Sequence, residues 1–74
     1  MSIYRQRIRE ILAAQGRIGT DPAHVEAWMR LEHGTLDGLS AAQFAREVSA
    51  AVECIEASTP DENRRLADSY GLSS

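Results

Sequence analysis

The 74-residue chain is long enough for one domain, and its 43% hydrophobic and 26% charged residues are typical of a globular protein. Its one cysteine excludes an internal disulfide and indicates a reducing compartment, and no apolar run approaches the roughly 20 residues that span a bilayer. The formal net charge is −3, but residues 1–20 carry +3 and residues 21–74 carry −6. The start of the chain lacks an apolar signal segment, and we therefore expect a cytoplasmic protein.

The first helix is expected from about Ser2 to Gln15, because apolar residues recur there at helical spacing and Gly16 ends the pattern. Arg5 and Arg9 flank the apolar stripe on one side, and Arg7 flanks it on the other. The arginines straddle the apolar face and form no single basic ridge. Solvated flanks are therefore favoured over a nucleic-acid surface.

The second helix is expected from Pro22 to His33, with Thr20 or Asp21 as its N-cap and Gly34 as its end. Its apolar residues occupy two sides of the helix: Val25, Ala27, Trp28, Met29 and Leu31. Such a broad apolar surface indicates a central helix that contacts more than one neighbour.

Glu32 interrupts this apolar surface, since it projects between Val25, Trp28 and Met29. An acid in that position is expected to be exposed at the domain edge, paired with an arginine, or bonded to backbone N–H groups of the following turn. A catalytic carboxylate would need a partner acid, a base or a metal, and the sequence pattern identifies none for Glu32. We therefore favour exposure or structural pairing over catalysis.

The third helix is expected from about Ala41 to Ala57. Ser40 and Gln43 have the spacing of a capping box, and Leu39 and Phe44 have that of a hydrophobic staple. The apolar stripe of this helix is the most regular in the chain: Phe44, Ala45, Val48, Ala51, Val52 and Ile55.

A short fourth helix is expected after Thr59, its N-cap, with Glu62 completing a capping box. It should continue to about Tyr70 and end at Gly71, with Leu72 folding back across that stop.

These elements predict an all-α fold in a single helical domain over residues 1–74. The domain is expected to be a compact bundle of three main helices plus a short C-terminal fourth helix. No segment shows the alternation or the β-branched clusters of a strand.

No catalytic, cofactor or metal site is evident. His24 and His33 are nine residues apart on different faces of one helix, and a single cysteine adds no ligand pair, so no metal and no cofactor is expected. Cys54 has acids nearby and no clustered cation, which favours a packing role over a nucleophile. Gly16 and Gly19 lack the strand and the lysine of a phosphate loop. We expect no enzymatic activity.

The stretch from Met29 to Asp37 reads Met-Arg-Leu-Glu-His-Gly-Thr-Leu-Asp, and Leu-Ser and then Phe44 follow it. Over roughly residues 21–57 the sequence resembles small uncharacterised helical proteins of bacterial prophages and other mobile elements. The resemblance implies a bacterial or phage context and a compact helical protein. It transfers no functional residue.

The sequence favours a small non-enzymatic interaction or accessory protein that binds a protein partner or itself. Alanines on the third helix permit close helix approach, so a homodimer is one expectation. The alternative is a nucleic-acid-binding module that uses the Arg-rich first helix, but split arginines and an acidic remainder argue against appreciable binding. We expect no membrane partner. The candidate partner-binding residues are Glu32, Arg5 and Arg9.

Overall fold

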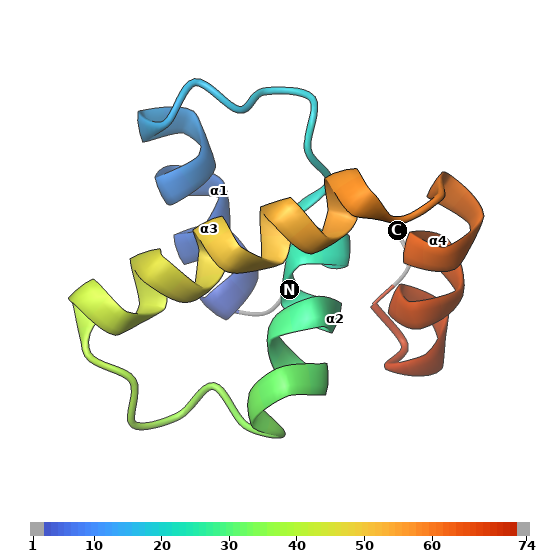
Figure 1. The fold of residues 1–74 in the computed structure, drawn as a ribbon. Helices are drawn as coiled ribbons and strands as arrows, with labels where there is room; N and C mark the ends of the chain where they lie inside the picture. The colour runs from blue at the N-terminus through green and yellow to red at the C-terminus, as the bar shows by residue number, and fades with distance from the viewer. Residues whose placement is uncertain (1–2, 73–74) are drawn as a thin grey trace.

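The computed structural model describes residues 3–72 and contains four helices in that range: α1 (Ile3–Ala14), α2 (Pro22–His33), α3 (Ala41–Ala57) and α4 (Pro60–Ser69) (Figure 1). The described residues include no strand, and the predicted all-α fold with a short last helix is confirmed. The bounds of α2 and α3 are the predicted ones, while α1 and α4 each end one residue earlier than expected. The predicted start at Ser2 lies outside the described residues.

Side-chain caps fix the starts of the two central helices. Asp21, and not Thr20, caps α2, since Asp21 Oδ1 accepts a hydrogen bond from the Ala23 amide at 2.9 Å. The capping box of α3 is confirmed, because Ser40 and Gln43 each accept a bond from the other's backbone amide, both at 3.2 Å. These local bonds satisfy amides that the helix itself leaves unpaired.

The last helix is capped at both ends. Thr59 Oγ1 accepts a hydrogen bond from the Glu62 amide at 3.2 Å, but within the described range the Thr59 amide donates no bond to the Glu62 carboxylate, so this capping box is half complete. At the other end Gly71 has a φ of 70°, and the Leu72 amide donates to the Ala67 carbonyl at 2.8 Å. Leu72 therefore folds back as predicted.

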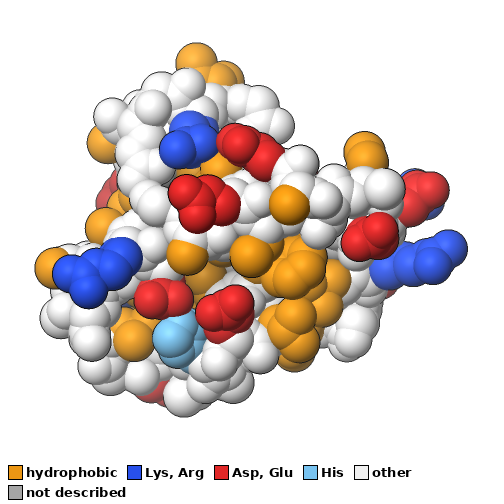
Figure 2. Space-filling model, viewed as in Figure 1, with side chains coloured by type: hydrophobic (Ala, Val, Ile, Leu, Met, Phe, Trp, Pro, Cys, Tyr) orange, Lys and Arg blue, Asp and Glu red, His pale blue; other side chains and the backbone are white. Residues whose placement is uncertain are grey.

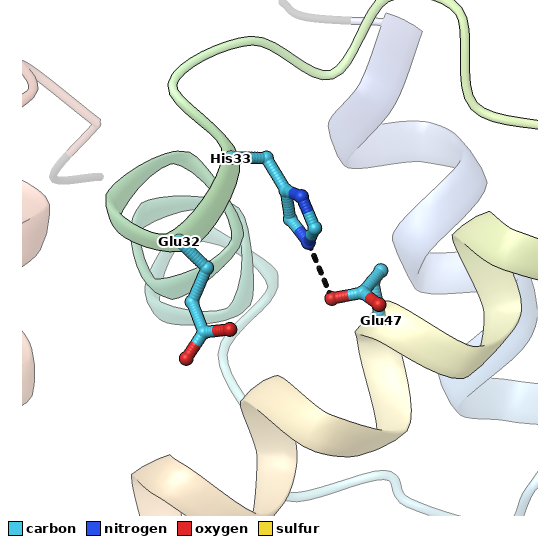
Figure 3. Close-up of side chains that lie close together, drawn as sticks. All are labelled: Glu32, His33 and Glu47. Atoms are coloured by element: carbon cyan, nitrogen blue, oxygen red, sulfur yellow. Dashed lines mark hydrogen bonds and ion pairs between the residues drawn. The ribbon is translucent and has the colours of Figure 1, made fainter.

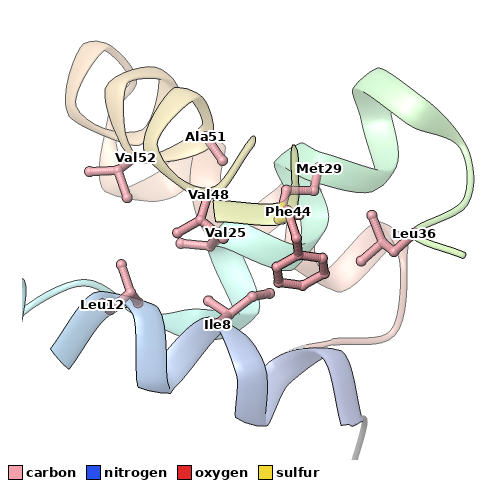
Figure 4. Packing of buried hydrophobic residues seen from close by; sticks show 9 residues of the cluster. All are labelled: Ile8, Leu12, Val25, Met29, Leu36, Phe44, Val48, Ala51 and Val52. Carbon is pink, nitrogen blue, oxygen red and sulfur yellow. The ribbon is translucent and has the colours of Figure 1, made fainter. Parts of the chain in front are cut away.

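α2 is the central element, because it contacts α1, α3 and α4 (Figure 1). The main core lies where α1, α2 and α3 meet, and Leu36 of the α2–α3 connection also belongs to it (Figure 4). Its buried residues are Ile8, Leu12, Val25, Met29, Leu36, Phe44, Val48, Ala51 and Val52. Leu31 differs from the sequence expectation: it lies in the last turn of α2 and is 53% exposed. The apolar surface of α2 is therefore covered along its length but open at its end.

A polar contact joins α4 to the rest of the molecule. The half-buried Trp28 donates its indole N–H to Asn63 Oδ1 at 2.8 Å, and Asn63 Nδ2 donates to the Ile55 carbonyl at 3.2 Å. Asn63 is only 4% exposed, so these bonds satisfy a buried amide. Among the residues described, no helix is long and apolar enough to cross a membrane.

Candidate functional site

The one fully buried charged side chain among the described residues is Glu26, with 0% exposure. Arg30 Nη2 lies 3.1 Å from Glu26 Oε2, and Arg5 Nε lies 3.7 Å from Glu26 Oε1. Arg5 also donates from Nη2 to the Leu72 carbonyl at 3.0 Å. The solvated flank predicted for Arg5 is therefore wrong: its side chain is only 18% exposed, because the buried carboxylate draws it inward.

The other arginines of α1 have separate environments. The Arg7 guanidinium lies 4.2 Å from the centroid of the Phe44 ring, a cation–π contact at the edge of the core. Arg9 is exposed and has no ion pair within the part of the chain that the structure describes. Of the three, only Arg9 has the solvated position that the sequence predicted for all of them.

Arg9 borders a groove between the second half of α1, the α1–α2 connection and the start of α2. The groove has a volume of about 280 Å³ and a mostly apolar lining. Ile18, in the connection, is 92% exposed at this groove. The lining residues are Arg9, Leu12, Ala13, Arg17, Ile18, Thr20 and Pro22.

Arg17 is held in place at the same groove by polar contacts. Its Nε donates to Gln15 Oε1 at 3.0 Å, and its Nη1 lies 3.3 Å from Glu56 Oε1 on α3. The Gln15 side chain in turn donates to Ser49 Oγ at 3.0 Å. Two arginines therefore lie at the groove. Arg9 has no ion pair among the described residues, and Arg17 is held by Glu56 of α3.

A second site forms where the end of α2 faces α3. His33 Nε2 lies 2.5 Å from Glu47 Oε2, and one ligand atom each of Glu32, His33 and Glu47 lie within 4.8 Å of one another (Figure 3). Glu32 and His33 are exposed and Glu47 is half-buried. Glu32 thus takes the exposed position that the sequence allowed, but beside another acid and with no arginine partner in the described range.

This cluster borders a small hollow of about 10 Å³ between α2 and α3. The hollow is lined by Trp28, Met29, Glu32, Glu47, Ala50, Ala51 and Cys54. On this face of the molecule a histidine lies between two acidic side chains, with hydrophobic surface beside them (Figure 2). Cys54 is a half-buried free thiol at the edge of the hollow.

The structure places the three predicted partner-binding residues in three different sites. Arg5 belongs to the buried network, Arg9 to the groove, and Glu32 to the carboxylate–histidine cluster. The sequence reasoning missed Glu26 and the approach of Glu47 to His33. The Glu26–Arg30 pair could have been predicted, because the two residues are four apart on one helix. The contact between His33 and Glu47 joins residues 14 apart on two helices, so no local pattern predicts it.

Comparison with protein-family models, with curated proteins and with solved structures gives no match. The similarity to prophage and mobile-element proteins therefore stays a prediction.

Proposed function

We propose that this protein is a non-enzymatic interaction module that binds an apolar, acidic segment of a partner protein in the groove between α1 and the start of α2. The observation that carries the proposal is the position of Ile18, which is 92% exposed at the rim of an open, mostly apolar groove. Contiguous exposed apolar surface on a small domain usually marks a contact site.

The charges at the groove favour an acidic partner. Arg9 is without an ion pair among the described residues, and Arg17 is held in place by Gln15 and Glu56 at the same rim. A carboxylate of the partner that approaches Arg9 would gain a charge-assisted hydrogen bond without first breaking an ion pair. The net charge of −3 repels acidic surfaces over most of the molecule, and the two arginines at the groove supply the local attraction that an acidic segment needs.

The size of the groove favours a peptide over an enclosed substrate. Its volume of about 280 Å³ is at the lower limit of pockets that enclose small molecules, which run from about 300 to 1,000 Å³. It is also open to solvent along the α1–α2 connection. One or two apolar side chains of a partner would fill it, which supports a binding role.

The nucleic-acid alternative has less support. Arg5 is bonded to Glu26 and Leu72, and Arg7 lies over the Phe44 ring, which leaves Arg9 as the solvated arginine of α1. One free arginine neutralises few phosphates, and phosphate neutralisation provides most of the affinity for nucleic acid.

The first test selects displayed 12-residue peptides on the purified chain and measures the enriched sequences by fluorescence anisotropy. We expect enriched peptides to combine large apolar residues with Asp or Glu. Ile18→Ser should weaken their binding at least about tenfold, since burial of an isoleucine contributes roughly 1.5–3 kcal/mol. The matched control is Ile3→Ser, because Ile3 is 71% exposed and lies outside the groove.

A second pair of variants tests the charge. Arg9→Gln should weaken binding of the acidic peptides and reduce its dependence on salt, whereas Arg46→Gln on α3 should do neither. Equal effects of Ile18→Ser and Ile3→Ser would rule out the groove. Concentration-dependent self-association that Ile18→Ser abolishes, measured by sedimentation equilibrium, would identify a second copy of this chain as the occupant instead.

A further inference from the structure

We propose that Glu32, His33 and Glu47 form a binding site for one divalent transition-metal ion, of which Zn²⁺ is the best representative. The site lies between the end of α2 and the first half of α3 (Figure 3). It is separate from the groove at α1, and it does not depend on the interaction proposed there.

The donor set indicates the class of metal. An imidazole nitrogen and two carboxylate oxygens are ligands that Zn²⁺ and its neighbours in the transition series bind well, whereas Mg²⁺ and Ca²⁺ favour oxygen ligands alone. Two ligand atoms of a tetrahedral zinc ion lie roughly 3.3–3.6 Å apart, since each bond is about 2.0–2.2 Å long. The three ligand atoms lie within 4.8 Å of one another, and His33 Nε2 contacts Glu47 Oε2 directly. A bound ion would replace that contact, and rotation of the exposed Glu32 side chain would bring in the third ligand.

The charges around Glu32, His33 and Glu47 also favour a bound cation. Two carboxylates converge on one imidazole, and no arginine within residues 3–72 pairs with Glu32 or Glu47. The four arginines that form ion pairs are bound to other acids. Like charges so close together repel, and His33 supplies at most one positive charge. A divalent cation bound between them would balance both carboxylates.

The backbone on either side holds the two helices in a fixed relation. The Gly34 amide donates to the Arg30 carbonyl at 2.7 Å and ends α2 directly after His33, while the Ser40 capping box begins α3. Between them Leu36 is 2% exposed and anchors the connection in the core. The approach of Glu47 to His33 is therefore built into the fold, as a pre-organised metal site requires.

Three protein ligands leave one position of a tetrahedral ion open. The hollow beside the cluster has about 10 Å³ of room, which is about enough for one water molecule, and Glu32 and Glu47 are among the residues that line it. We assign the fourth position to water.

The test is isothermal titration calorimetry of the tag-free, chelator-treated 74-residue chain with ZnCl₂. We expect one ion per chain, and we expect His33→Gln to weaken binding at least about tenfold, as even outer-shell changes at metal sites do. His24→Gln is the matched control. His24 Nε2 lies 3.6 Å from Asp21 Oδ2, which gives the same pairing of a histidine with a carboxylate but no third donor.

Cobalt(II) absorption gives a readout of the donors themselves. Visible bands of bound Co²⁺ should change in Glu32→Gln and in Glu47→Gln, and circular dichroism should show that both variants remain helical, because neither side chain is buried. No binding by the unmodified chain, or equal losses in His24→Gln and His33→Gln, would overturn the site. A thiolate-to-cobalt charge-transfer band would overturn the assigned donors, since it would place Cys54 in the coordination sphere.

Discussion

Two glutamates six residues apart on α2 have opposite environments. Glu26 is fully buried, with Arg5 and Arg30 on either side of its carboxylate. Glu32 is exposed and lies beside Glu47, and within the described residues no arginine forms an ion pair with either acid. A glutamate of the same helix is therefore part of the interior at position 26 and a solvent-exposed carboxylate at position 32. What differs is the set of charges beside each acid: Glu26 lies beside Arg5 of α1 and Arg30 of α2, whereas Glu32 lies beside Glu47 of α3.

The buried position is not an ideal ion-pair network. Arg5 Nε and Glu26 Oε1 are 3.7 Å apart, and neither atom has a hydrogen-bond partner in the described part of the chain. Burial of charge costs several kcal/mol per ion, which such a pair only partly offsets. The three charges add little net stability together, but removal of one of them would leave the others half-buried or buried without a partner.

The largest expected effect follows from this asymmetry. Glu26→Ala should lower the free energy of unfolding by about 3–5 kcal/mol, because it strands two half-buried guanidinium groups against the core. Urea denaturation followed by circular dichroism measures the loss. The triple variant Arg5→Leu, Glu26→Met and Arg30→Leu is the control, and it should be more stable than the single variant. A single-variant loss below about 1 kcal/mol would mean that the network has little structural role.

A neutral buried side chain separates the effect of burial from the effect of charge. Asn63 is 4% exposed and bonds both Trp28 and the Ile55 carbonyl. Asn63→Ala should cost about 1–3 kcal/mol, since it leaves the Trp28 indole N–H without its partner and exposes no unpaired charge. The Ile55 carbonyl loses one bond but keeps the one that it accepts from the Ser58 amide. The same denaturation experiment applies. A loss equal to that of Glu26→Ala would show that burial, and not charge, determines the difference between the two glutamates.

The smallest effect is expected at the exposed position. Without metal, Glu32→Gln should change the free energy of unfolding by less than about 0.5 kcal/mol, and in the stabilising direction, because it removes repulsion from Glu47. With Zn²⁺ present the unmodified chain should be more stable than Glu32→Gln, since only the unmodified site gains stability from the ion. Thermal unfolding with chelator and with ZnCl₂ measures both. A marked loss in chelator would show that Glu32 stabilises the fold in a way its exposure does not reveal.

The sequence predicted what depends on neighbouring residues and missed what depends on helix packing. The caps at Ser40 and Thr59 and the turn at Gly34 involve groups within four residues of each other, so spacing alone located the end of α2 and the starts of α3 and α4. The approach of Glu47 to His33 depends on how α2 and α3 cross, which no local pattern records. Ile18 is similar: the sequence treats it as part of a short connection, and only the packing of α1 against α2 turns that connection into the rim of a groove.

The bond from Arg5 to the Leu72 carbonyl joins segments 67 residues apart. The first turns of a helix and the residues after a last helix normally fray independently, and their amides exchange with solvent through separate local openings. Departure of either segment breaks this bond, and departure of the first turns of α1 also removes Arg5 from the buried Glu26 carboxylate. We therefore expect the local openings that expose the start of α1 and Leu72 to be coupled in hydrogen exchange.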